Sequence, residues 1–553
     1  MEDINMTTTE RFARGAIAPD NRLFSNFKVM VETAFYGNNV TPVDDLATAY
    51  HNAATTPGVI ITDMPVAHAA DLGLPADAKL LVSNDGKVVG RTAAARRIIG
   101  QPGIDSDYYA GILREAIFDG TSRQFDRGDV IVGLSNEFSV HAHLCLNHRS
   151  APNFYSYLLN FQLATADARA HYADSAALPE DDIYLYADPE WSHPDFPNGL
   201  ALFDPAHNVA AVLGLRYFGE LKKATLTLAW ATAHRNGFVA CHGGMKQYDL
   251  GDRKFTMAAY GLSGSGKSTI TFAKHGDKYK VTILHDDAFV INQQTGSTTA
   301  LEPAYFDKTA DYHTYDDAVR YFLTCQNVGV TLDEDGKKVI VTQELRNNNG
   351  RAVKSRYMTP NRADHLAEPL DAIFWIMKDE TLPPILQIDD PALAAVFGLT
   401  LATKRSTAEN LVGPVDRNQL VIEPFANPFR CYPLAEDYAD FKALFHDRGT
   451  ACYVLNTGYY GTTKVTPAVT LGAIEQVANE RGTWHAFGPV PGMQYLPVDG
   501  YSVDFADADY AQAFRARIQA RLDFVNQQKT AMEGYNQLPA DAATVLQAVL
   551  DQL

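Results

Sequence analysis

The chain has 553 residues, of which 46% are apolar and 20% are charged. This composition supports a large buried core and excludes a mostly disordered protein. The 66 acidic residues outnumber the 47 Lys and Arg residues and give a formal net charge of −19. So acidic a chain argues against nonspecific binding to nucleic acid or to an anionic membrane. At about 150 residues per domain the length allows three to four domains, and two large domains fit as well.

The five cysteines stand alone in the sequence, without a CxxC pair. This spacing argues against a zinc ribbon or a disulfide framework and suits a reducing compartment. The N-terminal segment lacks the apolar stretch of a secretory signal, and no apolar run approaches the roughly 18 residues of a membrane helix. We therefore expect a cytoplasmic protein without a membrane partner.

Segments of the first half predict a mixed α/β order. Residues 129–134 (DVIVGL) and 139–146 (SVHAHLCL) have the apolar and β-branched content of strands. Residues 173–198 are rich in Pro, Asp and Ala, which indicates a long irregular connection. Residues 222–234 predict a helix that ends near Asn236 and Gly237.

The second half alternates short apolar runs with turns. Residues 255–260, 281–291, 337–345 and 370–377 predict strands, and the second of these runs contains two carboxylates. Near the end, apolar residues recur at three- and four-residue spacing, which predicts the core-facing stripe of a helix. They are Tyr510, Phe514, Ile518, Leu522 and Val525. We place a domain boundary near residue 240.

The strongest motif is a glycine-rich loop between the predicted strand 255–260 and a short predicted helix. Its sequence, GLSGSGKS, fits the phosphate-binding pattern GxxxxGK[ST]. Glycines allow positive φ angles and bring backbone N–H groups close to phosphate oxygens. In such a loop Lys267 reaches the β- and γ-phosphates, and the Ser268 hydroxyl ligates Mg²⁺. The predicted nucleotide-binding residues are Gly261, Leu262, Ser263, Gly264, Ser265, Gly266, Lys267, Ser268 and Thr269.

Two carboxylates, Asp286 and Asp287, lie about 20 residues after the loop, in the next apolar run. A strand end capped by Asp would explain them alone, but beside a phosphate loop such a carboxylate can hold a divalent ion. A cationic segment, RYFGELKK (216–223), precedes the loop, and His242 lies between the two. Adjacent lysines usually mark a solvated face, and a lone histidine is more often structural.

Taken together, these motifs resemble the ATP-dependent phosphoenolpyruvate carboxykinases. The similarity runs, with gaps, from about residue 80 to about residue 500, with the motifs in the family's order. The supporting segments are RYFGELKK, the lone His242, YGLSGSGKST (260–269), the DD pair, EPAYFDK (302–308), KSRYMTP (354–360), AIFWIMKDETLPP (372–384), NTGYYGTTK (456–464) and GRTAAARR (90–97).

The resemblance implies an α/β fold of two domains with an active-site cleft between them. Residues 1–240 would form an N-terminal substrate-binding domain, and residues 241–553 a nucleotide-binding domain that carries the phosphate loop (P-loop). Members of this family interconvert oxaloacetate plus ATP with phosphoenolpyruvate, CO₂ and ADP. The implied partners are therefore a small dicarboxylate and a nucleotide, with Mg²⁺ and Mn²⁺ as cofactors.

The resemblance also implies roles for individual residues. Mn²⁺ would be bound by Lys223, His242 and Asp287, whereas Ser268, with Asp286 nearby, would serve Mg²⁺ at the ATP phosphates. A lysine that ligates a metal must be neutral, so its pKa has to fall far below about 10.4, and a neighbouring cation pushes it in that direction. The further catalytic candidates are Arg91, Tyr217, Lys222, Ser263, Lys267 and Arg356, and the further nucleotide-binding candidates are Glu302 and Lys464.

Several positions depart from the family's usual pattern and suggest a divergent branch. Gly243 to Lys246 replace the usual Cys-Ser-Ala-Asn after the metal histidine, and Val465 stands where the family has an arginine. Two alternatives to oxaloacetate carboxykinase therefore stay open. One is a kinase of another small carboxylic acid on the same scaffold, and the other is a noncatalytic protein that senses ATP.

Three histidines in the first half, His141, His143 and His148, form the pattern HxHxxxxH. Alternation along a strand would place the first two on one face, and a metal site is conceivable there. We favour the simpler interpretation that they are partly exposed strand histidines, because the family resemblance implies no metal at this place.

Overall fold

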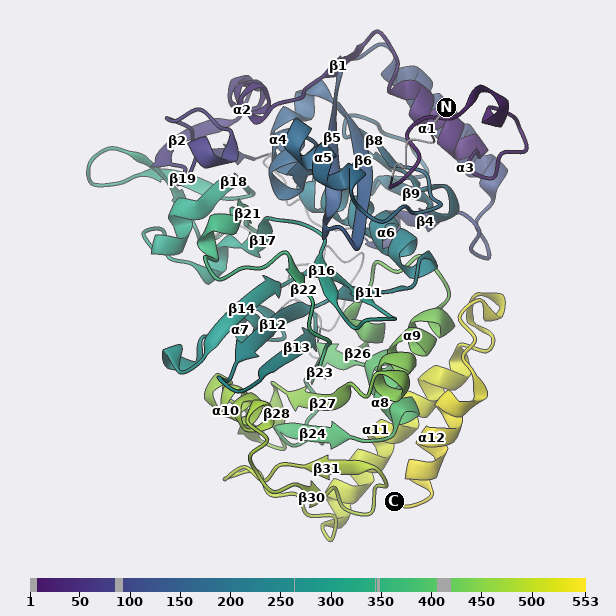
Figure 1. Cartoon of the computed structure of the whole chain (residues 1–553), viewed down its shortest axis with the longest axis vertical. Coiled ribbons are helices and arrows are strands. Elements are labelled where there is room, and N and C mark those ends of the chain that lie inside the picture. The colour runs from purple at the N-terminus through teal and green to yellow at the C-terminus, as the bar shows by residue number, and fades with distance from the viewer. Residues whose placement is uncertain (1–6, 85–92, 263, 344, 346–348, 405–418) are drawn as a thin grey trace.

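The computed structural model describes residues 7–84, 93–262, 264–343, 345, 349–404 and 419–553. Its elements form a mixed α/β fold with several sheets (Figure 1). Elements of the first half gather at one end of the molecule, and the yellow C-terminal helices lie at the other. Within the described ranges, no helix combines the length and the apolar character that crossing a membrane requires.

An eight-stranded sheet organises the first half. Its order is β1-β5-β6-β8-β10-β9-β4, with β7 paired to β5. The bounds are β1 Val40–Pro42, β4 Arg96–Ile98, β5 Phe125–Ser135, β6 Phe138–Asn147, β7 Gln162–Leu163, β8 Ile183–Asp188, β9 Leu200–Asp204 and β10 Val209–Leu213. The core strands are buried on both faces because helices cover each side. Helices α1 (Asn26–Ala34) and α3 (Ser106–Gly120) pack on one face, and α4 (Ala151–Asn160) and α6 (Phe218–Arg235) pack on the other.

The predictions for this half are confirmed in part. Both expected strands exist as β5 and β6, and the expected helix exists as α6, which begins at Phe218 and so includes Lys222 and Lys223 of the cationic segment. The expectation of an irregular connection over 173–198 is wrong, because β8 lies inside it. Apolar and aromatic side chains fill β8 up to its last residue, Asp188, and the Pro residues and the other Asp residues that suggested a loop flank the strand.

A second eight-stranded sheet organises the other half, in the order β14-β12-β13-β23-β27-β24-β31-β30. Its bounds are β12 Gly244–Asp249, β13 Lys254–Tyr260, β14 Lys280–His285, β23 Ala372–Met377, β24 Ile385–Ile388, β27 Ala451–Asn456, β30 His485–Ala486 and β31 Met493–Tyr495. Strands β13, β23 and β27 run parallel. One face is covered by α8 (Pro391–Leu399), α9 (Leu434–Asp447), α11 (Ala508–Gln527) and α12 (Ala540–Leu550), and the other by α7 (Lys267–Phe272) and α10 (Pro467–Ala478).

Two smaller sheets have four and five strands. One has the order β11-β15-β16-β22, with bounds Phe238–His242, Ala288–Asn292, Thr298–Ala300 and His365–Leu366. The other has the order β17-β21-β18-β3-β2, with bounds Tyr305–Lys308, Arg351–Lys354, Phe322–Gln326, Lys79–Ser83 and Ile60–Pro65. This five-stranded sheet takes strands from both sides of residue 240.

The expected single strand over 281–291 is wrong in one instructive respect. The run is split into β14 and β15, which belong to different sheets, and the break falls at Asp286 and Asp287. The other expectations for this half hold more closely. The run 337–345 contains β20 (Lys338–Val341), and the C-terminal stripe is buried on α11 from Phe514 to Val525.

Candidate active site

Helix α6 carries two lysines toward one carboxylate. Its residues are almost all buried, and the side chains of Lys222 and Lys223 are 0% and 13% exposed. The Nζ atom of Lys223 lies 2.8 Å from Oδ2 of Asp287, and Lys222 donates to the same oxygen. Lys222 also pairs with Oε1 of Glu302 at 2.8 Å, and Asn160 of α4 donates to the other oxygen of that glutamate at 2.6 Å.

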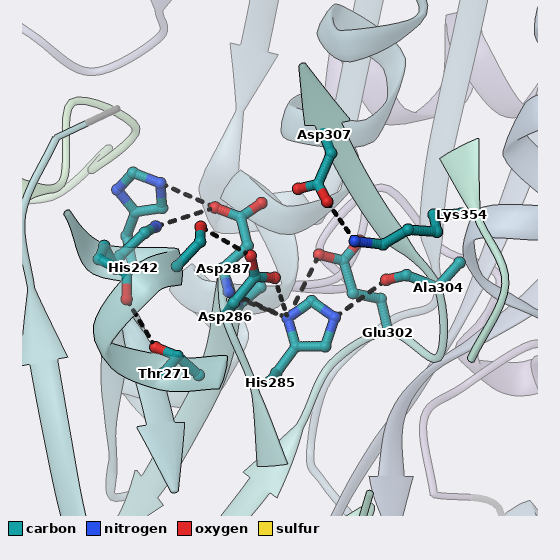
Figure 2. Close-up of polar contacts among 12 residues, drawn as sticks. His242, Thr271, His285, Asp286, Asp287, Glu302, Ala304, Asp307 and Lys354 are labelled. Carbon is teal, nitrogen blue, oxygen red and sulfur yellow. Dashed lines mark hydrogen bonds and ion pairs between the residues drawn. The ribbon is translucent and has the colours of Figure 1, made fainter. Parts of the chain in front are cut away.

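The turn between β14 and β15 places the two aspartates. His285 directs this turn, because its Nδ1 accepts the backbone N–H groups of Asp287 at 3.1 Å and Ala288 at 3.2 Å. Its Nε2 donates to the carbonyl oxygen of Ala304 at 2.9 Å (Figure 2). Burial lowers the pKa of His285 well below its usual value, so the ring stays neutral and can accept both N–H groups. Sequence reasoning missed this histidine, although it stands directly before the acidic pair.

His242, at the end of β11, faces the same carboxylate. Its Nε2 lies 2.9 Å from Oδ1 of Asp287, and its Nδ1 donates to the carbonyl oxygen of Ala426. Burial, together with the charges of Lys267 and Lys223, lowers the pKa of His242 to about 3. A neutral ring that keeps its proton on Nδ1 turns the Nε2 lone pair toward a carboxylate oxygen. Two lone pairs that face one another in this way cannot hydrogen-bond to each other, but both can be donated to a cation placed between them.

The two lysines differ in protonation. Burial and the charge of Lys222 lower the pKa of Lys223 to about 7, although the negative charge of Asp287 acts to raise it. Burial also disfavours the charged form of Lys222, but the carboxylates of Asp287 and Glu302 outweigh burial and raise its pKa. Burial opposes ionisation of Asp287 too, and the surrounding lysines overcome it and hold that pKa well below its usual range. The site therefore contains a fixed ammonium beside an amine that can be neutral near pH 7.

The glycine-rich loop follows β13 and leads into α7. Gly264 and Gly266 have φ angles of 80° and 99°, which side chains rarely adopt. A Cβ atom at Gly261 would lie 2.3 Å from Oγ of Ser265, so the first turn of the loop needs a glycine there. The loop is tied to the segment after β27, because Oγ1 of Thr457 donates to the carbonyl oxygen of Ser265 at 2.8 Å.

The first residues of α7 bring this loop to the acidic turn. Nζ of Lys267 lies 3.6 Å from Oδ1 of Asp287, and Oγ of Ser268 donates to Oδ2 of Asp286 at 3.1 Å. Burial, followed by the charge of Asp307, raises the pKa of Asp286 to about 6. Asp307 is itself paired with Lys354. Asp307 and Lys354 lie in segments that support the family resemblance, but neither residue was predicted from the sequence as part of the site.

The structure describes most of the remaining candidates. Tyr217 precedes α6 and is buried, with its ring 6.0 Å from that of Phe306. Arg356 pairs with Asp364 at 2.8 Å. Lys464 is exposed in β29 (Thr463–Lys464), and Glu302 is fully buried against Lys222. Leu262 is buried and Thr269 is exposed. Arg91 and Ser263 lie outside the described residues.

Comparison with known proteins gives one family and one curated relative. A family model described as phosphoenolpyruvate carboxykinase matches residues 76–480, which include every element of the cluster above. The chain is also 24% identical over 301 residues to a protein named phosphoenolpyruvate carboxykinase (ATP) from Aeropyrum pernix. That alignment covers 53% of this chain and 60% of the relative's length.

Proposed function

Because the chain belongs to the phosphoenolpyruvate carboxykinase family, we propose that it interconverts oxaloacetate plus ATP with phosphoenolpyruvate, CO₂ and ADP. The observation that carries this proposal is the convergence of Lys223, His242 and Asp287, with Lys267 of the glycine-rich loop 3.6 Å from the same aspartate. A protein that only senses ATP needs no such second group of ligands beside the loop.

The residues present fit a divalent ion such as Mn²⁺. Lys223, His242 and Asp287 would hold it, since two of these side chains offer neutral nitrogen donors near pH 7 and the third offers a carboxylate. When bound, the ion would supply positive charge for the oxygen that becomes negative as CO₂ leaves. The side chain of Lys222 is fully buried. Its role would be to hold Asp287 and Glu302 in place and to favour a neutral Lys223.

The glycine-rich loop would bind the phosphates of ATP or ADP as a P-loop. Positive φ angles at Gly264 and Gly266 suit a loop whose backbone N–H groups bind phosphate, and Lys267 would neutralise charge on the transferred phosphoryl group. Ser268 and Asp286, joined by a 3.1 Å hydrogen bond, would serve a nucleotide-bound Mg²⁺. Lys464 would lie toward the nucleotide on the segment that Thr457 ties to the loop.

The substrate side would be formed by cationic and phenolic groups. Arg356 and Arg91 would recognise the substrate's carboxylate and phosphoryl groups, since a guanidinium matches both. Tyr217 would lie beside the carboxylate that leaves. Closure of a cleft between residues 1–240 and 241–553 would exclude water and protect the enolate from protonation. In support of a cleft, α6 packs on the N-terminal sheet while Asp287 and Lys267 come from the second half.

A coupled assay tests the proposal directly. Oxaloacetate with ATP, or phosphoenolpyruvate with bicarbonate and ADP, is offered in the presence of Mn²⁺, and product formation should depend on both substrates and on the metal. The same assay with GTP or pyrophosphate identifies the phosphoryl donor. Turnover of another small carboxylic acid, with none of oxaloacetate, would replace the proposal with the alternative kinase. The biological setting we propose is cytoplasmic gluconeogenesis or anaplerosis.

A further inference from the structure

A second group of histidines and carboxylates lies in the N-terminal sheet, away from the cluster around Asp287. His141 and His143 project from β6, and Asp129 on β5 is the register partner of His143. Asp182 directly precedes β8, the strand on the other side of β6. Glu10 arrives from the N-terminal segment, which bridges to residue 181 through Thr9. Strands β5 and β6, the residue before β8 and the N-terminal segment thus bring these five side chains together, and we call them the β6 cluster.

The distances within the β6 cluster suit a shared ion. One ligand atom each from Asp129, His141 and His143 lies within 4.8 Å of the others, and the same holds for Glu10, His141 and Asp182. Because His141 belongs to both trios, it stands at the centre. Nδ1 of His141 and Nε2 of His143 approach the same oxygen of Asp182, at 3.0 Å and 2.9 Å. Both histidines are buried, at 1% and 6% exposure, which corrects the expectation that they are partly exposed.

The hydrogen-bond acceptors of the β6 cluster outnumber its protons, so the cluster lacks positive charge. His143 faces a carboxylate from each ring nitrogen, Asp129 at 2.8 Å and Asp182 at 2.9 Å, and a neutral imidazole has a proton for only one of them. A second proton on His143 would satisfy this pair alone. It leaves unexplained the buried Nε2 atom of His141, which has no hydrogen-bond partner among the residues that the structure describes.

The charges around the β6 cluster also favour a bound cation. The cluster contains three carboxylates, and Arg169, 2.9 Å from Asp129, is the guanidinium paired with one of them. Buried carboxylates are costly unless they are paired or bound to a metal. The side chain of Asp129 is 31% exposed, so this carboxylate of the cluster is in contact with solvent.

We propose that the β6 cluster binds a divalent transition-metal ion of the Zn²⁺ class, with His141, His143 and Asp182 as its principal ligands and Asp129 or Glu10 completing the set. Imidazole nitrogen combined with carboxylate oxygen is the donor set that such ions prefer. The ion would be structural. It would fasten the N-terminal segment to β5, β6 and β8.

Metal analysis of the full-length chain tests this site separately from the proposed catalytic one. Wild type, His141→Gln, His242→Gln and the double variant are stripped with chelator, dialysed against Zn²⁺ alone, and assayed for bound zinc by mass spectrometry. We expect His141→Gln to lose one ion relative to wild type whether or not residue 242 is also changed. His148→Gln is the matched control, because His148 is 52% exposed in its side chain, pairs with Asp126 and lies outside the cluster. It should keep the full zinc content.

A second measurement covers the case in which His141→Gln fails to fold. Zn²⁺ added to stripped His242→Gln should raise its melting temperature, and excess chelator should reverse the rise. The proposal is overturned if the zinc content of His141→Gln equals that of wild type, or if Zn²⁺ leaves the melting temperature of stripped His242→Gln unchanged. Neither readout depends on turnover, so failure of the catalytic proposal would leave this test intact.

Discussion

Lys222 and Lys223 are consecutive residues of α6, and both ammonium groups reach the same oxygen of Asp287, yet their pKa values move in opposite directions. Asp287 and Glu302, which both pair directly with Lys222, raise its pKa, whereas burial and the charge of Lys222 lower the pKa of Lys223. The helix thus carries a permanent cation next to an amine that can lose its proton near neutral pH. A metal-ligating lysine needs this second property.

The titration of Lys223 predicts how metal activation depends on pH. Its pKa of about 7 means that the amine is protonated below that pH and cannot ligate. We therefore expect the apparent affinity for Mn²⁺ to fall as pH decreases through about 7 and to level off above it. The measurement is the Mn²⁺ activation constant across that range at saturating substrates. An affinity independent of pH would show that Lys223 is not a ligand.

Replacement of Lys222 predicts a loss of stability. Lys222→Met leaves Asp287 and Glu302 short of a buried counter-ion, which should cost about 3–5 kcal/mol. The melting temperature from scanning calorimetry measures the effect. The double variant Lys222→Met/Glu302→Gln should recover part of the loss, because it removes one of the unpaired carboxylates. A double variant as unstable as the single one would refute this pairing.

Loss of the loop lysine predicts loss of phosphoryl transfer. Lys267→Ala should lower kcat/KM by about 100- to 1000-fold, because a preorganised cation at the transferred group disappears. The matched control is Lys278→Ala, since this lysine pairs with Glu475 near the surface and is 57% exposed in its side chain. Its kcat/KM should remain that of wild type. Unchanged turnover in Lys267→Ala would remove that residue from the reaction.

Asp287→Asn predicts loss of both activity and Mn²⁺ dependence. The amide keeps the shape of the side chain but cannot supply an anionic ligand. Loss of a residue that only supports a metal ligand lowers activity by up to about 100-fold, so loss of the ligand itself should lower it by more than that. Metal titration of the residual activity is the measurement. Asp390→Asn, at the N-terminus of α8, serves as a control because it alters a helix cap and not the cluster. Full Mn²⁺-dependent turnover in Asp287→Asn would contradict the proposed site.

The residues of the site could be predicted from the sequence more accurately than the strands that position them. Lys223, His242 and Asp287 could be selected because their motifs occur in a family order, and the structure brings them together. The break between β14 and β15 could not be predicted, since the apolar run contains no Gly or Pro to mark it. It depends on His285 accepting two backbone N–H groups, which is a tertiary arrangement.

The burial of polar side chains is the second property that could not be predicted from the sequence. From the sequence His143 is expected to be partly exposed, but in the structure it is buried and pairs with Asp129 of β5 and with Asp182, the residue before β8. The low pKa of Lys223 was expected from its neighbour Lys222, but burial is the larger cause. How deeply a side chain lies depends on layers contributed by distant parts of the chain, so periodicity alone cannot supply it.

The five-stranded sheet has a consequence for any attempt to divide the chain. Strand β18 pairs in parallel with β3, so a fragment that starts at residue 241 would expose the backbone edge that β3 now covers. Such an open edge invites self-association, and a fragment ending at residue 240 would carry β2 and β3 with no sheet to join. The two halves should therefore fold reliably only when they are synthesised together, and a proteolytic nick near residue 240 should leave the pieces bound to one another.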